Sequence, residues 1–566
     1  MTQQSQGFET RCLSSLSKVF PQAELQDAPI QTGTALWNEV YSFQVAYRSD
    51  RLIKGIRVEL DSELAPYATI RAVGLSPSEM PAYAETDSNY ITTEPGLFPD
   101  VLYPVAESEG LRALPNSWRA VWVTVKLPAM EAGLAGKGKT ASLYDIKLTL
   151  KEQSGEVLGQ EEFRLDIIPA ELPEQKLIHT EWFHTDCIAT QYDVDIFSED
   201  HWKLLDRYVR NAAEHGVNLL LTPLFTPPLD TAVGGERPTV QLVGVEKTGD
   251  GGYRFNFDKL DRWIGMCRSA GIRYFEMSHL FTQWGAKHAP KIMATVNGRE
   301  ERIFGWETDA ASEEYAGFLN QFLPQLVSFI KDRGLQDAVY FHVSDEPQAD
   351  HLEPYKRASE LLRRHLGGFK FIDALSDYSF YEHGLVEIPV PSNDHMDAFL
   401  EGNTNPLWTY YCCGQFREVS NRFFSMPSAR NRVLGLQLYK FDVQGFLHWG
   451  YNFWYSQYST RVIDPFCVTD AVCAFPSGDA FVVYPGEEGP IDSLRWEVFR
   501  EAQQDQRALE LLESLAGRDK ALELIEHGLA EPLHFKRYPT DMAWLLDVRG
   551  RINAAISAAL TASASQ

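Results

Sequence analysis

Residues 340–347 read Tyr-Phe-His-Val-Ser-Asp-Glu-Pro, and the fold is worked out from this stretch. Its aromatic and β-branched beginning predicts a strand. Side chains alternate between the faces of a strand, so Asp345 and Glu346 serve one site only where the strand opens into a loop. Pro347 ends the strand, because it has no amide hydrogen for the sheet and it holds Glu346 extended. The stretch predicts two adjacent carboxylates at the carboxyl end of a strand, where barrel glycosidases place catalytic acids; a helix cap in a solvated loop is the alternative.

The composition limits the class of protein. A chain of 566 residues with 44% hydrophobic and 12% aromatic content buries a large core in two or more domains. The formal charge of −26 opposes nucleic acid or an anionic membrane as a partner, because both are repelled. An uncharged glycan is compatible with this charge.

The cysteines and the N-terminus indicate the compartment. Seven cysteines, an odd number with none in a Cys-x-x-Cys pair, favour reduced thiols over disulfides or a zinc site. The first twenty residues lack the apolar core of a secretory signal, and no apolar run approaches the roughly 20 residues of a membrane-spanning helix. The sequence predicts a cytoplasmic protein without a membrane segment.

Three regions are expected along the chain. Short strand-forming runs such as residues 143–150, where apolar and polar side chains alternate, predict a β-sandwich over residues 1–172. Residues 173–466 alternate strands and helices and predict a (β/α)8 barrel. Residues 467–566 are expected to form a strand-and-helix extension packed on the barrel. The fold class is therefore multidomain α/β, with a C-terminal helical extension.

The barrel rests on eight candidate strands and the helices between them. Helices are expected at residues 200–213, 258–270, 312–333 and 353–366, each followed closely by a glycine. The strands are expected at residues 178–186, 217–223, 272–279, 340–343, 370–375, 386–390, 407–412 and 445–450. A long glycine-containing insertion between the second and third strands is expected at the face where barrel active sites lie.

Several motifs occur in order: LLLTPLF (219–225), HLFTQWGA (279–286), VSDEP (343–347), WTYYCC (408–413), GFLHWG (445–450) and SLRWE (493–497). Together they resemble the domain-of-unknown-function family 4091, which is similar to the glycoside hydrolase family 123 β-N-acetylgalactosaminidases. The resemblance covers roughly residues 140–515. It implies a β-sandwich followed by a (β/α)8 barrel, and retaining catalysis through the 2-acetamido group of the substrate.

The resemblance implies roles for the two catalytic candidates. Glu346 would protonate the glycosidic oxygen and later deprotonate water, while Asp345 would orient the acetamido nitrogen. Adjacent carboxylates suit this mechanism, because an ordinary retaining enzyme needs two carboxyls about 5–5.5 Å apart on opposite sides of the anomeric carbon. Two carboxylates this close also push their pKa values apart, which helps one to remain a proton donor.

Further candidates for substrate binding lie at other strand ends. His184 and Asp186 follow the first strand, where hydroxyl binding and a structural hydrogen-bonded pair are both open. After the third strand, Gln283 would bond a hydroxyl and Trp284 would stack on a sugar face. No His-x-His pair accompanies them, so neither a metal nor a cofactor is expected.

The seventh and eighth strands supply aromatic candidates. Tyr410 or Tyr411 would hold the acetamido carbonyl, with Tyr411 slightly favoured, whereas the adjacent cysteines 412 and 413 are expected to serve packing. Trp449, Tyr451 and Asn452 end the eighth strand, as an aromatic floor under the sugar or as a barrel-closing core cluster.

The sequence favours a retaining exo-β-N-acetylhexosaminidase, and the resemblance implies a preference for N-acetylgalactosamine. A glycosidase that acts on another sugar without acetamido participation, and a non-catalytic glycan-binding or scaffold protein, are the alternatives. The expected partner is a glycan, with no nucleic acid and no membrane; no oligomeric state is assigned.

Overall fold

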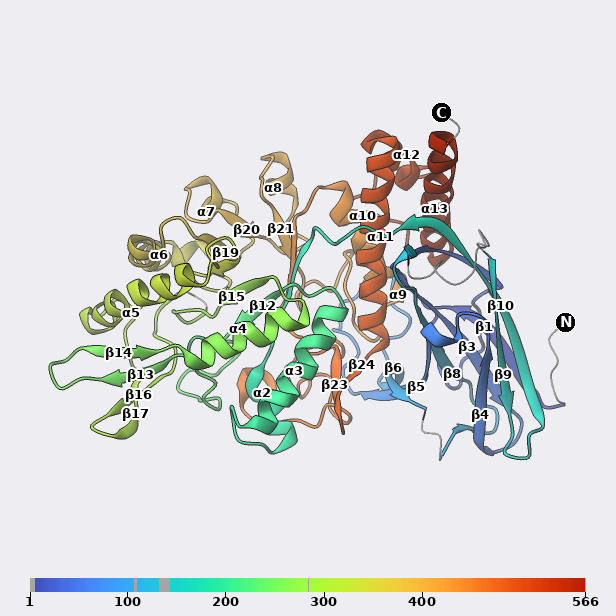
Figure 1. Ribbon diagram of the computed structural model, residues 1–566, viewed down its shortest axis with the longest axis horizontal. Helices are drawn as coiled ribbons and strands as arrows, with labels where there is room; N and C mark the ends of the chain where they lie inside the picture. The colour runs from blue at the N-terminus through green and yellow to red at the C-terminus, as the bar shows by residue number, and fades with distance from the viewer. Residues whose placement is uncertain (1–5, 106–108, 132–142, 284, 565–566) are drawn as a thin grey trace. The chain divides into compact units, whose positions relative to one another are not determined.

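A computed structural model of the protein describes residues 6–105, 109–131, 143–283 and 285–564. The chain divides into two compact units (Figure 1). The first unit consists of Met1–Lys176, Phe416–Phe441 and Ile491–Gln566, and the second of Leu177–Gln415 and Asp442–Pro490. The N-terminal and C-terminal parts of the chain thus belong to one unit, and the chain between them forms most of the other.

Two five-stranded sheets form the sandwich of the first unit. One sheet consists, in spatial order, of β1 (Phe8–Ser14), β3 (Val40–Ser49), β8 (Arg119–Lys126), β5 (Ala68–Ser78) and β6 (Gly96–Pro104). The other consists of β2 (Thr32–Trp37), β10 (Val157–Glu171), β9 (Leu143–Lys151), β4 (Ile53–Asp61) and β7 (Leu111–Ala113). Inward side chains of both sheets, such as Val123 and Phe163, share one hydrophobic core. The predicted N-terminal β-sandwich is confirmed.

Helices complete the first unit, and all but the short η1 come from the later parts of the chain. They are η1 (Ala65–Tyr67), α9 (Ser428–Arg432), α10 (Leu434–Lys440), α11 (Leu494–Ala516), α12 (Arg518–Glu526) and α13 (Met542–Ala564). A second hydrophobic core joins Trp122 of the sandwich to Val498 of α11 and Ile552 of α13. The predicted C-terminal helices are present.

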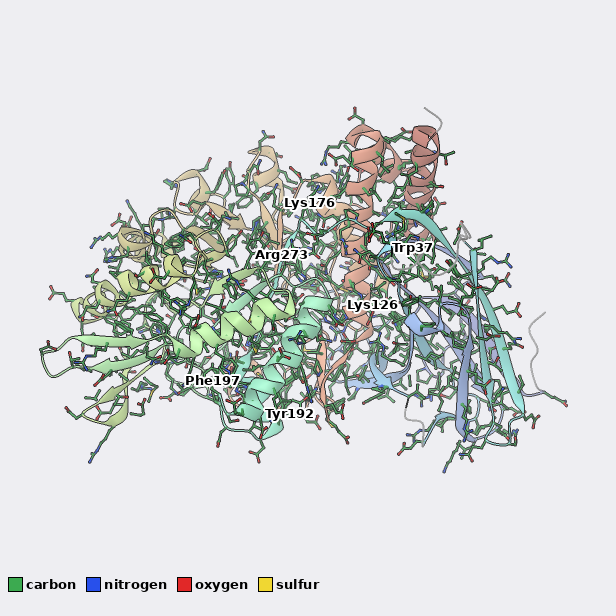
Figure 2. All side chains as sticks on the ribbon, viewed as in Figure 1. Trp37, Lys126, Lys176, Tyr192, Phe197 and Arg273 are labelled. Atoms are coloured by element: carbon green, nitrogen blue, oxygen red, sulfur yellow. The ribbon has the colours of Figure 1, made fainter. Side chains whose placement is uncertain are left out.

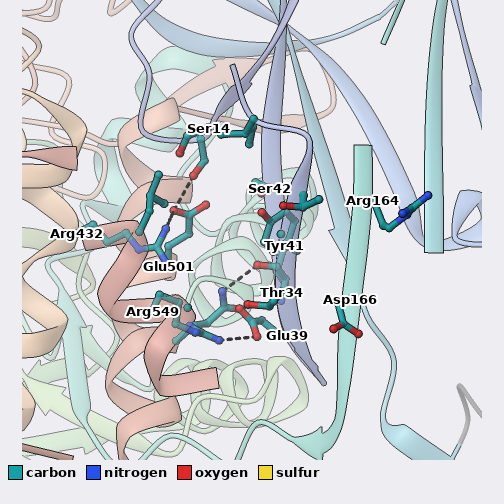
Figure 3. Close-up of a pocket in the computed structure, with 18 of the residues that line it drawn as sticks. Ser14, Thr34, Glu39, Tyr41, Ser42, Arg164, Asp166, Arg432, Glu501 and Arg549 are labelled. Atoms are coloured by element: carbon teal, nitrogen blue, oxygen red, sulfur yellow. Dashed lines mark hydrogen bonds and ion pairs between the residues drawn. The ribbon is translucent and has the colours of Figure 1, made fainter. Parts of the chain in front are cut away.

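A cavity of about 480 Å³ lies between the sandwich and these helices (Figure 3). Its buried charged side chains are paired: Arg432 binds Glu501 at 2.7 Å, and Arg549 binds Glu39 at 2.7 Å. Asp505 accepts hydrogen bonds from both arginines. Because these charges are satisfied within the protein, the cavity offers few groups for a ligand, and we look for the active site elsewhere.

The second unit is built on eight parallel strands. In spatial order they are β20 (Ile388–Val390), β19 (Lys370–Ala374), β18 (Val339–Phe341), β15 (Tyr274–Met277), β12 (Leu219–Thr222), β11 (Ile178–Glu181), β22 (Gly445–His448) and β21 (Trp408–Tyr410). A parallel bridge between Ser392, just after β20, and Tyr410 of β21 joins the two ends of the sheet. The strands are almost wholly buried, as expected when helices cover the outside of a parallel barrel. The predicted (β/α)8 barrel is confirmed.

Helices follow most of the barrel strands. They are α2 (Thr185–Tyr192), α3 (Glu199–Glu214), α4 (Asp258–Ala270), α5 (Glu313–Asp332), η2 (Ala349–His351), α6 (Leu352–Leu366), α7 (Ser379–Glu382), α8 (Asp397–Glu401) and η3 (Gln457–Ser459). The four predicted helices correspond to α3, α4, α5 and α6 within one residue at each end. Ser198 and Ser312 cap α3 and α5 by accepting a backbone N–H. Phe197, labelled in Figure 2, stacks on Trp202 of α3 and fixes the start of that helix.

Insertions after β12 and β15 form a small separate sheet. It consists of β14 (Tyr253–Asn256), β13 (Gly244–Lys247), β16 (Ile292–Val296) and β17 (Arg299–Phe304). A two-stranded sheet of β23 (Val483–Gly486) and β24 (Gly489–Asp492) lies where the chain returns to the first unit. The sequence predicted the insertion after the second strand, although not the strands within it.

The compact units differ from the predicted three-part division. Residues 491–566 group with the sandwich in the first unit, whereas the sequence analysis treated residues 467–566 as a separate extension on the barrel. The boundaries at residues 172 and 466 stay predictions. Among the described residues, no helix combines the length and the apolar character needed to cross a membrane.

Candidate active site

A cavity of about 170 Å³ lies at the carboxyl ends of the barrel strands. Parallel strands all point their carboxyl ends to one face of a barrel, so residues far apart in sequence meet there. The described residues that line the cavity are Trp182, Leu229, Asp230, Gln283, Asp345, Glu346, Ala374, Tyr410, Cys412, Cys413, Leu447, Trp449, Gln457, Tyr458 and Phe475. Three of them are carboxylates and none is a lysine or arginine.

Asp345 and Glu346 share this cavity because the backbone turns between them. Strand β18 ends at Phe341, and Glu346 has a φ of 45°, in the left-handed region that non-glycine residues seldom adopt. Its backbone N–H donates to the Ala374 carbonyl at 3.0 Å, which holds this turn against β19. The turn places both adjacent carboxylates in the cavity wall, which an extended strand could not do.

Tyr410 contacts one carboxylate of the pair. Its hydroxyl donates to Glu346 Oε1 at 2.8 Å. Burial raises the pKa of Tyr410 far above its usual value, and the nearby Glu346 charge raises it further. Tyr410 therefore remains a hydrogen-bond donor, which fixes the orientation of the half-buried Glu346 carboxylate.

Asp345 is the more buried member of the pair, with 8% of its surface exposed. Burial raises its pKa well above the usual value, and the charge of Glu346 adds to this effect. Two carboxylates in such a site do not ionise independently. The arrangement can therefore hold one proton beside one negative charge at neutral pH, as acid–base chemistry requires.

Asp230 is a third carboxylate in the cavity, and the sequence analysis missed it. It lies on the insertion after β12, where its Oδ2 accepts the Tyr458 N–H at 3.1 Å and its own N–H donates to Gln283 Oε1 at 2.7 Å. Burial raises the pKa of Asp230 to about 6. No strand or helix periodicity marks this loop, so only the length of the insertion signalled it.

The walls of the cavity are aromatic. Trp449 donates from Nε1 to Asp479 at 2.9 Å and meets Phe475 edge to face, with ring centroids 5.3 Å apart. Trp182, from the end of β11, donates from Nε1 to the buried Glu276 at 2.7 Å. Indole rings fixed in this way can stack on a sugar while the carboxylates bind its polar atoms.

A family model described as the catalytic domain of glycoside hydrolase 123 matches residues 182–512, more than half of the chain. The chain belongs to glycoside hydrolase family 123. It is therefore a glycoside hydrolase, and its partner is a glycan substrate. All of the cavity carboxylates described above lie inside the matched range.

A solved structure has the same fold. A family 123 glycoside hydrolase from Clostridium perfringens, studied for glycolipid glycan hydrolysis, superposes with a TM-score of 0.74 at 16% identity, over 97% of this chain and 98% of the other. At this identity the likeness shows the fold. No curated protein sequence matches the chain.

More distant structures include two β-glucuronidases. The Bacteroides uniformis protein has 12% identity and a TM-score of 0.30, over 86% of this chain and 49% of its own. The protein from Dictyoglomus thermophilum has 10% identity and a TM-score of 0.31, over 88% of this chain and 98% of its own.

In this family 123 enzyme, His184 and Asp186 lie in a buried cluster outside the cavity lining. Asp186 receives two hydrogen bonds from Arg237, at 2.6 and 2.9 Å, and one from Tyr455. His184 contacts the Trp449 carbonyl at 2.9 Å. Burial and the Arg237 charge lower the pKa of His184 to about 3, so this ring is neutral. His184 thus holds the Trp449 backbone and Asp186 holds Arg237, so both side chains have structural partners.

Other predicted residues also have protein partners instead of facing the cavity. Tyr451 donates to the Tyr208 carbonyl at 3.0 Å, and Asn452 donates to the His184 carbonyl at 3.1 Å. Tyr411 packs edge to face on Phe446 and does not line the cavity. Of the two candidate tyrosines, the structure places Tyr410 in the cavity. Trp284 lies outside the described residues.

Both adjacent cysteines line the cavity, although the sequence analysis expected them to serve packing. Cys412 lies two positions past β21, and its Sγ contacts Gln415 Oε1 at 3.3 Å. Its pKa is raised well above the usual value, first by the hydrogen bond with Cys413 and then by burial. The Cys412 thiol is therefore a neutral part of the wall rather than a thiolate nucleophile.

Three buried side chains of the types that bind metal ions lie close together near the cavity. Atoms of His279, His342 and Asp373 lie within 4.8 Å of one another. However, His342 Nε2 contacts Glu276 at 2.6 Å, and Asp373 accepts the Val343 N–H at 3.0 Å. Since protein donors and acceptors already occupy these two side chains, the group suits a bound proton better than a metal ion.

Proposed function

We propose that this family 123 enzyme is a retaining exo-β-N-acetylhexosaminidase, with N-acetylgalactosamine as the favoured sugar. The observation that carries the proposal is the position of Asp345 and Glu346, adjacent in sequence and in one cavity wall. Neighbours on one strand end suit the division of labour of substrate-assisted catalysis better than attack from opposite faces. The preference for N-acetylgalactosamine follows the sequence resemblance.

Glu346 is the general acid and base in this mechanism. It donates its proton to the glycosidic oxygen while the acetamido oxygen attacks the anomeric carbon, and the bond to the leaving group breaks. The Glu346 carboxylate then takes a proton from water, which opens the oxazoline ring and restores the original configuration. Tyr410, bound to Glu346 Oε1, holds the carboxylate in place through both steps.

Asp345 has the second role. Its carboxylate accepts the acetamido N–H, which turns the acetamido oxygen toward the anomeric carbon and stabilises the positive charge of the oxazolinium-like intermediate. A buried carboxylate stabilises such charge strongly, because little water screens the interaction.

The size of the cavity supports exo action. Its volume of about 170 Å³ lies below the about 300–1,000 Å³ of common ligand pockets, so it suits a single sugar ring. The walls formed by Trp182 and Trp449 offer faces on which one ring can stack.

Asp230 favours a second candidate function, a glycosidase that does not use an acetamido group. As a carboxylate of the same cavity on a different loop, it could face Glu346 across a sugar and act as nucleophile or base. In that case the substrate needs no 2-acetamido group.

Four aryl β-glycosides separate the two candidates: the N-acetylgalactosaminide, the N-acetylglucosaminide and their 2-hydroxy counterparts. We expect turnover of the acetamido sugars alone, with its loss in Asp345→Asn and its persistence in Asp230→Asn. Hydrolysis of 2-hydroxy sugars that depends on Asp230 would instead establish the second candidate. Proton NMR of the first product tests retention of configuration.

A further inference from the structure

A row of buried ionisable side chains lies behind the catalytic pair. Glu276 belongs to β15, His342 follows β18 and Asp373 belongs to β19, and these three strands are neighbours in the barrel. All three side chains are at most 2% exposed. Buried charges are costly unless they are paired, so their arrangement calls for an explanation.

His342 lies between the two carboxylates. Its Nε2 is 2.6 Å from Glu276 Oε1, and its Nδ1 is 3.4 Å from Asp373 Oδ1. A neutral imidazole donates from one nitrogen and accepts at the other, whereas the imidazolium donates from both. Carboxylate oxygens near both nitrogens favour the imidazolium, although the 3.4 Å contact of Nδ1 is an ion pair too long for a strong hydrogen bond.

Other contacts keep the two carboxylates as acceptors. Glu276 accepts hydrogen bonds from Thr180 at 2.6 Å and from Trp182 Nε1 at 2.7 Å. Asp373 accepts from the Tyr355 hydroxyl and from the Val343 N–H. Donors of this kind favour the ionised form of a carboxylate, although burial outweighs them at Asp373 and raises its pKa.

The ionisation of His342 agrees with this geometry. Burial lowers its pKa, but the hydrogen bonds and charges of Asp373 and Glu276 outweigh burial and raise the pKa to about 9. His279 stacks on the ring with centroids 4.1 Å apart. Burial and the charge of His342 lower the pKa of His279 far below its usual value, so one ring of the stack is charged and the other neutral.

The row of buried ionisable side chains is hydrogen-bonded to the backbone beside the catalytic pair. Asp373 also accepts the Ser344 N–H at 3.3 Å, so it anchors the backbone immediately before Asp345. Three carboxylates, Glu346, Asp373 and Glu276, oppose ionisation of Asp345, and the charge of His342 favours it. The imidazolium therefore offsets the crowding of negative charge behind the cavity.

We infer that His342 is a positioning residue: its imidazolium charge, held between Glu276 and Asp373, counteracts the neighbouring carboxylates and favours the ionised, hydrogen-bond-accepting form of Asp345. This inference rests on the proposed role of Asp345. The ionisable groups that face His342 are Glu276 and His279 from β15 and its following loop, Asp373 from β19, and Asp345 on its own segment. Tyr355 of α6 acts through Asp373.

His342→Gln tests the inference through the pH profile of kcat. Loss of the cation raises the pH at which Asp345 becomes protonated, so the acidic limb should move upward by about one unit, the low end of the effect of an adjacent opposite charge. At neutral pH kcat should fall about tenfold, with KM changed less than threefold. A loss of kcat that is uniform across pH, with an unmoved limb, would overturn the inference in favour of a structural role.

His201→Gln is the matched control. This histidine of α3 is also fully buried and bonded on both nitrogens, at 2.9 Å to the Phe197 N–H and 3.1 Å to the Thr185 carbonyl. It lies outside the cavity lining, so its loss should lower stability without moving the acidic limb.

A measurement on the wild-type enzyme needs neither turnover nor a folded variant. In protein labelled with 15N-histidine, the His342 ring, identified by its contacts with the ring of His279, should carry protons on both nitrogens up to pH 8. A singly protonated His342 at pH 7 overturns the inference. If both protons are present but no acetamido glycoside is hydrolysed, the proposed function fails while the charge on His342 stands.

Discussion

Each unit of the molecule contains a buried cluster of charges, and the two clusters are balanced differently. In the first unit, Arg432 and Arg549 face the carboxylates of Glu39, Glu501 and Asp505, and each arginine binds two carboxylates. At the barrel mouth, five carboxylates (Asp230, Glu276, Asp345, Glu346 and Asp373) lie near one charged histidine, His342, whose neighbour His279 is neutral. Ion pairs between elements fix their packing, and burial still raises the pKa of Glu501 in the first cluster to about 7. An excess of carboxylates beside a cavity, as in the barrel, marks a reactive site.

The largest effect we expect is from Glu346→Gln, which tests whether the barrel cluster performs the chemistry. The amide keeps the shape but has no proton to give, so kcat/KM should fall by about 10²–10⁴-fold. The stability should change little because Glu346 is half-buried. Hydrolysis of the best aryl glycoside and binding of the free sugar measure the two effects. Full activity in this variant would remove the general acid from the proposal.

Arg432→Met tests whether the charge cluster of the first unit contributes to stability and not to catalysis. The variant leaves Glu501 buried without its cation and Asp505 paired with Arg549 alone, so the free energy of unfolding should fall by about 3–5 kcal/mol. Urea unfolding measures this change, and the pH profile of kcat should stay the same. The control is Arg417→Met, which breaks an exposed ion pair with Glu85 and should cost about 0–1 kcal/mol. Equal losses in the two variants would contradict the contrast.

Tyr410→Phe sharpens the assignment between the two neighbouring tyrosines. A hydrogen bond to a charged group contributes about 1.5–3 kcal/mol, so its loss from Glu346 should lower kcat about tenfold or more. Tyr411→Phe is the matched control and should leave kcat within about twofold, because Tyr411 does not line the cavity. The reverse order would favour the tyrosine that the sequence analysis preferred.

The smallest expected effect concerns Asp230 and its dependence on pH. The folded protein raises the pKa of Asp230 to about 6, above the unfolded value of about 3.9. The group therefore contributes stability below pH 4 that is lost as pH rises through 6. Asp230→Asn should raise the free energy of unfolding, measured by urea unfolding, slightly at pH 7.5, by about 1 kcal/mol or less, and leave it unchanged or lower at pH 4. A lower free energy of unfolding at pH 7.5 would contradict the raised pKa of Asp230.

The sequence predicted the barrel well because its strands are buried on both faces and its helices have clear ends. The stretch LLLT of β12 and the cap at Ser312 illustrate these two signals. The pair Asp345 and Glu346 was also predicted, since a proline marks the end of their strand. Their backbone turn at Glu346 could not be read from the sequence.

The site residues that the sequence did not predict correctly were missed for physical reasons. Asp230 lies in a loop without periodicity, where no local pattern tells which side chains face a cavity. The choice between Tyr410 and Tyr411 depends on which face of a three-residue strand points inward, and a shift of one position reverses it. His184 and Asp186 belong to a buried cluster because of Arg237, a partner some fifty positions away in the sequence.

The bridge between Ser392 and Tyr410 links the integrity of the barrel to its activity. At this seam the Tyr410 carbonyl accepts the Asn393 N–H at 2.9 Å, while the same residue holds Glu346 through its hydroxyl. A local opening of this seam would release the acid while the rest of the barrel stays folded. Activity should therefore be lost at a temperature below the melting temperature of the protein. It should return on cooling, when the two ends of the sheet pair again.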